Sequence, residues 1–208
     1  MNIAAIKTNN IANGPGVRTA VFCSGCTHHC PQCFQPETWN EKFGDKYTSE
    51  TEQQILDSLK PDYIAGITLL GGEPFEPSHR DTLTSLIKKV YELYPKKTIW
   101  AYSGYTFEEL TGKTPSRCGN ATDMLKFVDT LVDGEFKIDK KDISLVFRGS
   151  SNQRIIDVQK SLVLDKVVLN PEYVMTPQQQ KTDADRTAKE AEDAQKTIKN
   201  DINNEPEL

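Results

Sequence analysis

The chain has 208 residues, and 30 Asp and Glu against 25 Lys and Arg give it a net charge of −5. An acidic chain offers no basic surface for nucleic acid, and no apolar run approaches the roughly 20 residues that span a bilayer. The length suits one domain with a sizeable core. The N-terminus lacks the apolar core of a signal peptide, so we expect a cytoplasmic protein, in which clustered cysteines indicate metal rather than disulfides.

Apolar, β-branched runs alternate with helical patterns along most of the chain. The patterns predict strands over residues 17–22, 63–70, 98–102 and 130–132, and helices over 50–60, 83–94 and from about 107. Further strand candidates lie at 143–147 and 163–169. The alternation favours a mainly parallel sheet, in which ligands bind beyond the carboxyl ends of the strands.

The composition changes after about residue 176. Aromatic residues stop, and Lys, Asp, Glu, Asn and Gln dominate. We expect residues 1–176 to form the domain and 177–208 to form a polar tail, either disordered or weakly helical. A thin helical stripe of small apolar residues runs through that tail, at Ala184, Ala188, Ala191, Ala194 and Ile198.

Three cysteines, Cys26, Cys30 and Cys33, follow the first predicted strand with the spacing C-x3-C-x2-C. Three thiolates can hold three corners of a cubane iron–sulfur cluster and leave the fourth iron open. Two alternatives remain: a four-thiolate zinc site that includes Cys23, and a closed electron-transfer cluster with Cys23 or Cys118 as fourth ligand. Zinc ribbons usually separate their cysteine pairs by about 15–20 residues, which disfavours zinc. We expect His28 and His29 to face solvent or a partner.

The run Gly71-Gly72-Glu73-Pro74 ends the second predicted strand. Two glycines permit a tight turn, and they also let a ligand approach the backbone closely. Glu73 supplies a carboxylate that can accept a hydrogen bond from an ammonium group. We expect the cysteine loop and this turn to meet over one site, with Gly72 leaving room for the ligand.

The pairing of these two motifs resembles the radical S-adenosylmethionine enzymes. The resemblance implies a [4Fe–4S] cluster held by Cys26, Cys30 and Cys33, with S-adenosylmethionine chelating the open iron. It also implies a partial, open (β/α) barrel with a mainly parallel sheet. Many members have an aromatic residue before the third cysteine, near adenine, where this chain has Gln32 followed by Cys33 and Phe34. The cofactor-binding residues implied are Gln32, Cys33, Phe34, Gly71, Gly72 and Glu73.

Further motifs narrow the resemblance to glycyl-radical-enzyme activases, in particular those of anaerobic ribonucleoside-triphosphate reductase. These motifs lie at residues 13–18, 100–110, 131–136 and 147–154, and they add Ser103 and Arg148 as cofactor-pocket or partner-surface residues. The resemblance implies reductive cleavage of S-adenosylmethionine and a glycyl radical on the large reductase subunit. A flavodoxin-like or other low-potential donor would supply the electron, and no residue would act as a general acid or base.

Other functions remain compatible with the sequence. Within the same chemistry, the chain could activate pyruvate formate-lyase or act on a small molecule. In a different class, it could be a metal-stabilised binding protein or an electron carrier.

Overall fold

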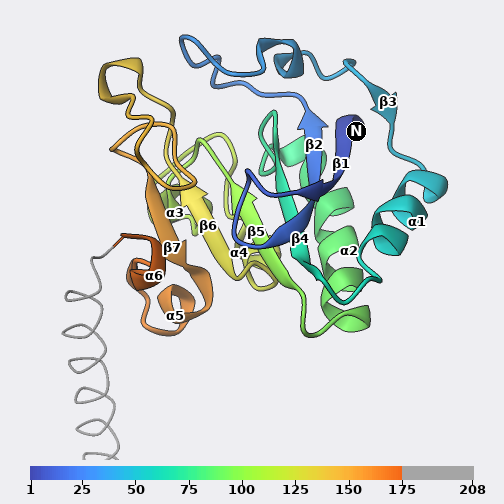
Figure 1. The fold of residues 1–208 in the computed structure, drawn as a ribbon. Helices are drawn as coiled ribbons and strands as arrows, with labels where there is room; N and C mark the ends of the chain where they lie inside the picture. The colour runs from blue at the N-terminus through green and yellow to red at the C-terminus, as the bar shows by residue number, and fades with distance from the viewer. Residues whose placement is uncertain (175–208) are drawn as a thin grey trace, which may run out of the picture. The chain divides into compact units, whose positions relative to one another are not determined.

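The computed structural model describes residues 1–174, and a seven-stranded sheet lies at its centre (Figure 1). Across the sheet the strands follow the order β3-β1-β2-β4-β5-β6-β7. Their bounds are β1 (Asn2–Asn10), β2 (Val17–Ser24), β3 (Asp45–Lys46), β4 (Ile64–Gly71), β5 (Thr98–Tyr102), β6 (Thr130–Asp133) and β7 (Arg154–Asp157).

Helices connect or flank these strands. They are η1 (Pro36–Trp39), α1 (Ser49–Ser58), α2 (Pro77–Leu93), α3 (Phe107–Leu110), α4 (Thr122–Leu125), η2 (Ile138–Lys140) and α5 (Val158–Val163). The chain divides into two units, Met1–Leu169 and Asn170–Leu208, and the second contains the short helix α6 (Pro171–Val174). The predicted tail, residues 177–208, lies outside the described residues.

The prediction of a partial, open (β/α) barrel with a mainly parallel sheet is wrong. The β2–β4, β4–β5 and β5–β6 pairs are parallel, but β1–β2, β1–β3 and β6–β7 are antiparallel, so the sheet is mixed. Helices of 10 and 17 residues, α1 and α2, accompany the first two crossovers, whereas α3 and α4 have four residues each. A barrel needs a helix layer around its strands, and these short helices do not supply one in residues 1–174.

Most predicted elements are confirmed, and local signals explain them. Thr48 caps the N-terminus of helix α1: its side chain accepts from the Thr51 backbone N–H in a capping box. Thr106 caps α3 with the same arrangement toward Glu109. Such caps satisfy backbone donors that have no partner within the helix. The four predicted strands correspond to β2, β4, β5 and β6.

The two further strand candidates are wrong. Residues 143–147 form a turn, in which the Asp142 carboxylate accepts from the Ser144 N–H at 2.9 Å and Phe147 adopts a positive φ of 53°. Residues 163–169 begin with the end of α5 and then turn at Asp165, whose φ is 51°. Both segments are apolar, but their backbones reverse direction before a ladder can form.

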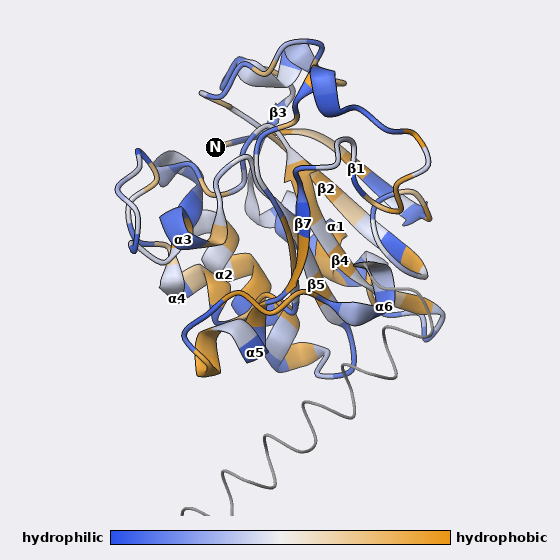
Figure 2. Ribbon diagram, turned by 90° about the vertical axis from the view of Figure 1, so that its left-hand side faces the viewer, coloured by the Kyte–Doolittle hydropathy of each residue, from blue (hydrophilic) through white to orange (hydrophobic). Residues whose placement is uncertain are grey.

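One face of the sheet packs into the hydrophobic core, and the other face lines a cavity. Along β2, β4 and β5, alternate residues such as Val21, Leu69 and Ala101 join the hydrophobic core with side chains of α1, α2 and α4. The neighbouring residues on the opposite face, which include Phe22, Leu70 and Tyr102, line a cavity instead. This alternation follows from the two-residue period of a strand. Hydrophobic residues are correspondingly concentrated in the central strands and α2 (Figure 2).

Arg18 is fully buried near the start of β2. Its guanidinium donates to the Thr68 hydroxyl at 2.8 Å and to the Ile67 and Thr98 carbonyl oxygens at 2.8 and 2.7 Å. A buried charge with this many acceptors is tolerated, and it ties β2, β4 and β5 together. Within residues 1–174, no helix is both long and apolar enough to cross a membrane.

Candidate functional site

The cysteine loop begins where β2 ends, beyond the carboxyl end of that strand. Gly25 starts the loop with a positive φ of 111°, and its N–H donates to the Thr38 carbonyl oxygen at 2.7 Å. The Cys26 backbone N–H donates to the Trp39 carbonyl oxygen at 3.3 Å. The helix η1 therefore holds the far end of the loop against its start. The backbone therefore encloses Cys30 and Cys33 between two fixed ends.

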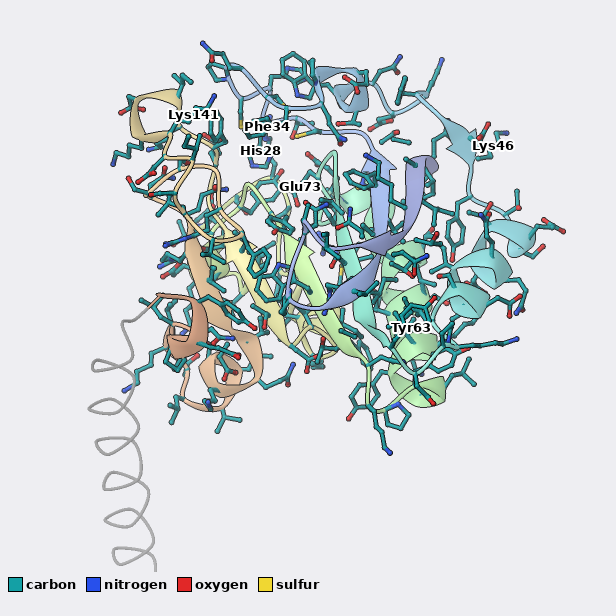
Figure 3. All side chains as sticks on the ribbon, viewed as in Figure 1. His28, Phe34, Lys46, Tyr63, Glu73 and Lys141 are labelled. Carbon is teal, nitrogen blue, oxygen red and sulfur yellow. The ribbon has the colours of Figure 1, made fainter. Side chains whose placement is uncertain are left out.

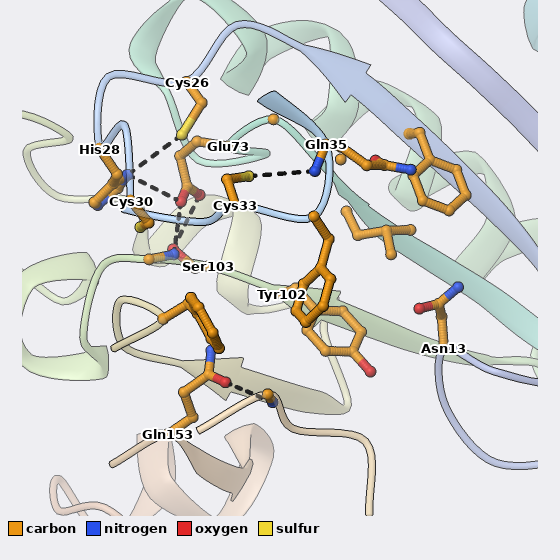
Figure 4. Close-up of a pocket in the computed structure, with 18 of the residues that line it drawn as sticks. Asn13, Cys26, His28, Cys30, Cys33, Gln35, Glu73, Tyr102, Ser103 and Gln153 are labelled. Carbon is orange, nitrogen blue, oxygen red and sulfur yellow. Dashed lines mark hydrogen bonds and ion pairs between the residues drawn. The ribbon is translucent and has the colours of Figure 1, made fainter. Parts of the chain in front are cut away.

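All three predicted ligands carry free thiols and line one cavity (Figure 4). Cys33 is further fixed by its N–H, which donates to the Cys30 carbonyl oxygen at 3.1 Å, and its sulfur accepts from the Gln35 N–H at 3.5 Å. Cys23 and Cys118 are each 1% exposed and neither lines the cavity, which opposes both sites that use one of them as a fourth ligand. Three cysteines thus line the cavity, and the other two are buried outside its lining.

The three thiols line one cavity, where they could serve as donors to a metal centre. Among residues 1–174, no group of three or more His, Cys, Asp or Glu side chains could hold one metal ion. A zinc ion needs all its thiolates at about 2.3 Å from one point, whereas each cysteine of a four-iron cluster binds a different iron. Three separated thiols around one cavity are compatible with the second requirement.

The Gly71–Pro74 turn packs directly against the start of the cysteine loop. The Gly72 N–H donates to the Cys23 carbonyl oxygen at 2.8 Å, and the Glu73 N–H donates to that of Gly25 at 2.8 Å. A Cβ on Gly72 would lie 2.4 Å from the Gly25 carbonyl oxygen. Both glycines line the cavity, but the close contact that requires glycine at 72 is with the cysteine loop, which differs from our expectation.

Glu73 is 1% exposed and is held by three hydrogen bonds. One carboxylate oxygen accepts from the Phe75 N–H and the Ser103 hydroxyl, both at 2.9 Å, and the other accepts from the Gly104 N–H at 2.7 Å. Burial raises the pKa of Glu73 to about 7, and the hydrogen bonds from Phe75, Gly104 and Ser103 oppose that rise. The hydrogen bonds therefore orient the carboxylate, and a cation beside it would stabilise its ionised form.

His28 does not face solvent, contrary to our expectation. Its side chain is 5% exposed, and its Nδ1 lies 3.7 Å from both the Cys26 sulfur and a carboxylate oxygen of Glu73. The ring packs edge-on against Tyr105 at 4.3 Å between centroids. Burial lowers the pKa of His28, and the charge of Glu135 partly offsets this. The His28 ring thus lies between the cysteine loop and the turn.

A second connection between loop and turn was not predicted. The Glu76 carboxylate accepts from the Thr27 N–H at 3.0 Å and from the Thr27 hydroxyl, and it lies 3.4 Å from the Tyr105 hydroxyl. Glu76 is 7% exposed at the start of α2. In the sequence, an acidic residue before Pro77 is an ordinary helix N-terminus, so only the burial of its carboxylate distinguishes it.

The cavity has a volume of about 590 Å³, within the usual range for ligand sites. Its walls come from the cysteine loop, the Gly71–Glu73 turn, the end of β5 and the connection between β6 and β7. Of the predicted site residues, Gln32 alone is absent from the lining: it is exposed, with a φ of 57°. The predicted site residues on the lining are Cys26, Cys30, Cys33, Phe34, Gly71, Gly72, Glu73, Ser103 and Arg148.

Comparison with known families and proteins addresses the same part of the chain. Residues 12–156 match the family model described as a 4Fe-4S single cluster domain. Three similar proteins, each called an anaerobic ribonucleoside-triphosphate reductase-activating protein, come from Pasteurella multocida, Escherichia coli K12 and phage T4. They are 40%, 39% and 36% identical over 157, 157 and 155 residues. The matches cover 74% of this chain and 96%, 96% and 93% of those proteins.

Proposed function

The chain belongs to the 4Fe-4S single cluster domain family and to the family of anaerobic ribonucleoside-triphosphate reductase-activating proteins, and from that membership we propose its reaction. It generates a glycyl radical on the large subunit of an anaerobic ribonucleotide reductase. S-Adenosylmethionine is cleaved reductively at a [4Fe–4S] cluster to do so. The protein is thus an oxidoreductase whose substrate is another protein.

The observation that carries the proposal is that one cavity holds three free thiols and an oriented, buried carboxylate. Cys26, Cys30 and Cys33 would each bind one iron and leave the fourth open, because Cys23 and Cys118 lie away from the cavity. Glu73 would accept a hydrogen bond from the amino group of S-adenosylmethionine, and the positive charge of that group would favour ionised Glu73.

A cluster held by Cys26, Cys30 and Cys33 would supply the one electron for reductive cleavage of S-adenosylmethionine, and the cofactor would then supply the radical chemistry at the glycine. The chain's own residues would bind the cofactor and orient it. Ser103 holds the Glu73 carboxylate through the hydrogen bond at 2.9 Å, and Gly71 and Gly72 bring that carboxylate beside the cysteine loop. Phe34 and Arg148 line the same cavity and would contact the cofactor. Gln32, which lies off the cavity wall, receives no role.

A low-potential donor of the flavodoxin type would reduce the cluster. A closed electron-transfer cluster is the alternative of a different class, and it requires a fourth protein ligand. The two remaining cysteines are buried away from the cavity, which favours the open cluster.

The test uses anaerobically reconstituted protein, dithionite and S-adenosylmethionine. We expect release of 5′-deoxyadenosine, and with the reductase present we expect the electron paramagnetic resonance doublet of a glycyl radical. Cleavage without a radical on the reductase would leave a radical enzyme with another target. Zinc at one per chain, with no uptake of iron, would refute the proposal.

A further inference from the structure

The connection between β6 and β7, residues 134–153, forms a narrow hairpin beside the cavity. Lys141 pairs with Ser150 in an isolated antiparallel bridge, and the Ser151 N–H donates to the Lys140 carbonyl oxygen at 2.9 Å. Gln153 fixes the base, because its side-chain oxygen accepts from the Gly149 N–H at 2.9 Å. We call residues 134–153 the rim hairpin; residues 143–148 are its tip.

The tip presents apolar side chains in two directions. Leu145 and Phe147 line the cavity, whereas Ile143 is 94% and Val146 is 52% exposed, and Ile138 on η2 is 38% exposed. Three large apolar side chains exposed within nine residues, on a hairpin held by its own hydrogen bonds, are typical of a surface that a partner covers. A preordered surface of this kind also loses little conformational entropy on binding.

The rim hairpin has more basic than acidic residues, whereas the chain as a whole is acidic. The whole chain carries −5, but the hairpin has four basic and three acidic residues. Of its carboxylates, Glu135 lies 4.0 Å from His28, and Asp142 accepts from the Ser144 N–H and hydroxyl at 2.9 and 2.6 Å. The third, Asp139, is exposed. Lys137 and Lys140 are exposed and form no ion pair with any residue of 1–174. The hairpin therefore favours an acidic partner over another copy of this acidic chain.

The rim hairpin also contacts the cysteine loop. The Phe34 ring lies 5.4 Å from that of Phe136 between centroids, and the Lys141 ammonium lies 5.8 Å from the centre of the Phe34 ring (Figure 3). Phe34 itself is 71% exposed and lines the cavity. A partner seated on the hairpin would therefore lie at the edge of the cavity.

We propose that the rim hairpin docks a segment of the reductase in which apolar side chains alternate with Asp or Glu. Ile138, Ile143 and Val146 bury apolar side chains of that segment, and Lys137 and Lys140 pair with its carboxylates. The inference rests on the proposed function, which supplies the partner, and it adds the surface that positions this partner over the site. Electrostatic pairs of this kind act mainly on association and make it sensitive to salt.

The test is a triple variant, Lys137→Glu with Lys140→Glu and Ile143→Ser, which changes no residue assigned to the cluster or the cofactor. Binding of the variant to the purified large reductase subunit is measured by biolayer interferometry at two salt concentrations. We expect the dissociation constant to rise about tenfold or more at low salt, and to depend less on salt than that of the parent. At subsaturating reductase, the glycyl-radical yield of the variant should be lower than that of the parent. It should recover as the concentration of reductase is raised.

A matched control carries the same kinds of change at the opposite end of the sheet, near the start of β5. Leu93 is 58% exposed at the end of α2 and Lys96 is exposed nearby, so Leu93→Ser with Lys96→Glu alters charge and apolar surface away from the cavity. The control should bind the reductase as the parent does. Both variants should release 5′-deoxyadenosine at the parental rate without reductase, which separates this inference from the proposed function.

Three outcomes would overturn the inference. The triple variant could bind the reductase with parental affinity, or the control could lose affinity equally, which would indicate a general effect of charge. Sedimentation velocity could show that the parent self-associates while the triple variant does not, which would assign the hairpin to a second copy of the chain. Because binding is measured directly, each result is informative even if the parent fails to cleave S-adenosylmethionine.

Discussion

Burial affects the protonation of two cavity thiols, those of Cys26 and Cys30. It raises the pKa of Cys26 to about 12 and raises the pKa of Cys30 as well. Iron binds the thiolate, so protons compete with iron at neutral pH, and the competition weakens as pH rises. We therefore expect the reconstituted cluster to resist a chelator better at pH 9 than at pH 7. Equal rates of iron loss at both pH values would contradict this.

Individual cysteines should divide into two classes when replaced by alanine. Cys26→Ala, Cys30→Ala and Cys33→Ala each remove a thiol from the cavity wall and should abolish the S-adenosylmethionine-sensitive signal of the reduced cluster. Cys23→Ala and Cys118→Ala shrink buried side chains elsewhere, so they should keep about four irons per chain and cost only about 1 kcal/mol of stability. Iron and sulfide analysis, together with electron paramagnetic resonance, measures the cluster in all five variants. Loss of the cluster in Cys23→Ala would refute the assignment of three ligands.

Gly72→Ala should disturb the cluster as well as the cofactor. The added Cβ would meet the Gly25 carbonyl oxygen at 2.4 Å, so the start of the cysteine loop must move. We expect lower iron content and faster iron loss on exposure to a chelator, together with reduced 5′-deoxyadenosine release.

The control for this substitution is Gly119→Asn. A Cβ there meets nothing within 4 Å, and asparagine tolerates its positive φ of 61°. It should retain parental iron content. If Gly72→Ala keeps a stable cluster and loses only cleavage, the ligand rather than the loop requires this glycine.

At the scale of elements, sequence patterns located the parts with strong periodicity and missed those whose partners are distant in sequence. The parallel strands β2, β4, β5 and β6 are apolar runs with clear ends, so they were predicted. Strands β1 and β7 were not, because β1 includes Lys7, Thr8, Asn9 and Asn10, and β7 has only two apolar residues between charged Arg154 and Asp157. Their antiparallel pairing changed the fold class.

The sequence motifs located residues that line the cavity, but not the contacts that join the two motifs. Cysteine spacing and the glycine turn are local signals, and both motifs lie on one cavity. The contacts of His28 and Glu76 span 45 and 49 residues, and nothing in either neighbourhood indicates them. Polar residues buried by tertiary packing leave no periodic trace in the sequence.

The β6–β7 pair depends on an ion pair with a buried carboxylate. Arg154 on β7 donates to Asp133 on β6, which is 1% exposed, and to Glu108 on α3 at 2.7 Å. Arg154→Ala leaves Asp133 buried without its cation, and because Arg154 is partly exposed we expect a loss of roughly 2–3 kcal/mol. Thermal unfolding of the apoprotein measures it. Lys126→Ala, which breaks an exposed pair with Asp123, should leave the melting temperature unchanged.

At the scale of the whole molecule, the core and the site occupy opposite faces of one sheet. Among the described residues, 1–174, those that line the cavity lie between Lys7 and Gln153, and the family match ends at residue 156. The polar segment beyond residue 176 has little apolar surface to offset its ordering, which costs about 1–2 kcal/mol per residue. We therefore expect the fold and the cluster to be independent of that segment.

A chain truncated after Thr176 should bind its cluster and release 5′-deoxyadenosine at the parental rate. Iron content and cleavage in the absence of the reductase are the measurements. Radical yield on the reductase is measured in parallel, since a drop in that quantity alone would assign the segment to partner binding. Loss of iron on truncation would refute the division of the chain at residue 176.

The hydrogen bonds that join Thr27 to Glu76 and Gly25 to Glu73 involve no metal. We therefore expect these contacts to hold the ends of the cysteine loop before iron arrives, unlike a zinc finger, which is unfolded without its ion. Oxygen that destroys the cluster should consequently leave a folded protein rather than a substrate for proteases. We therefore expect fresh iron and sulfide to restore activity to protein that has lost its cluster in air, without new synthesis of the chain.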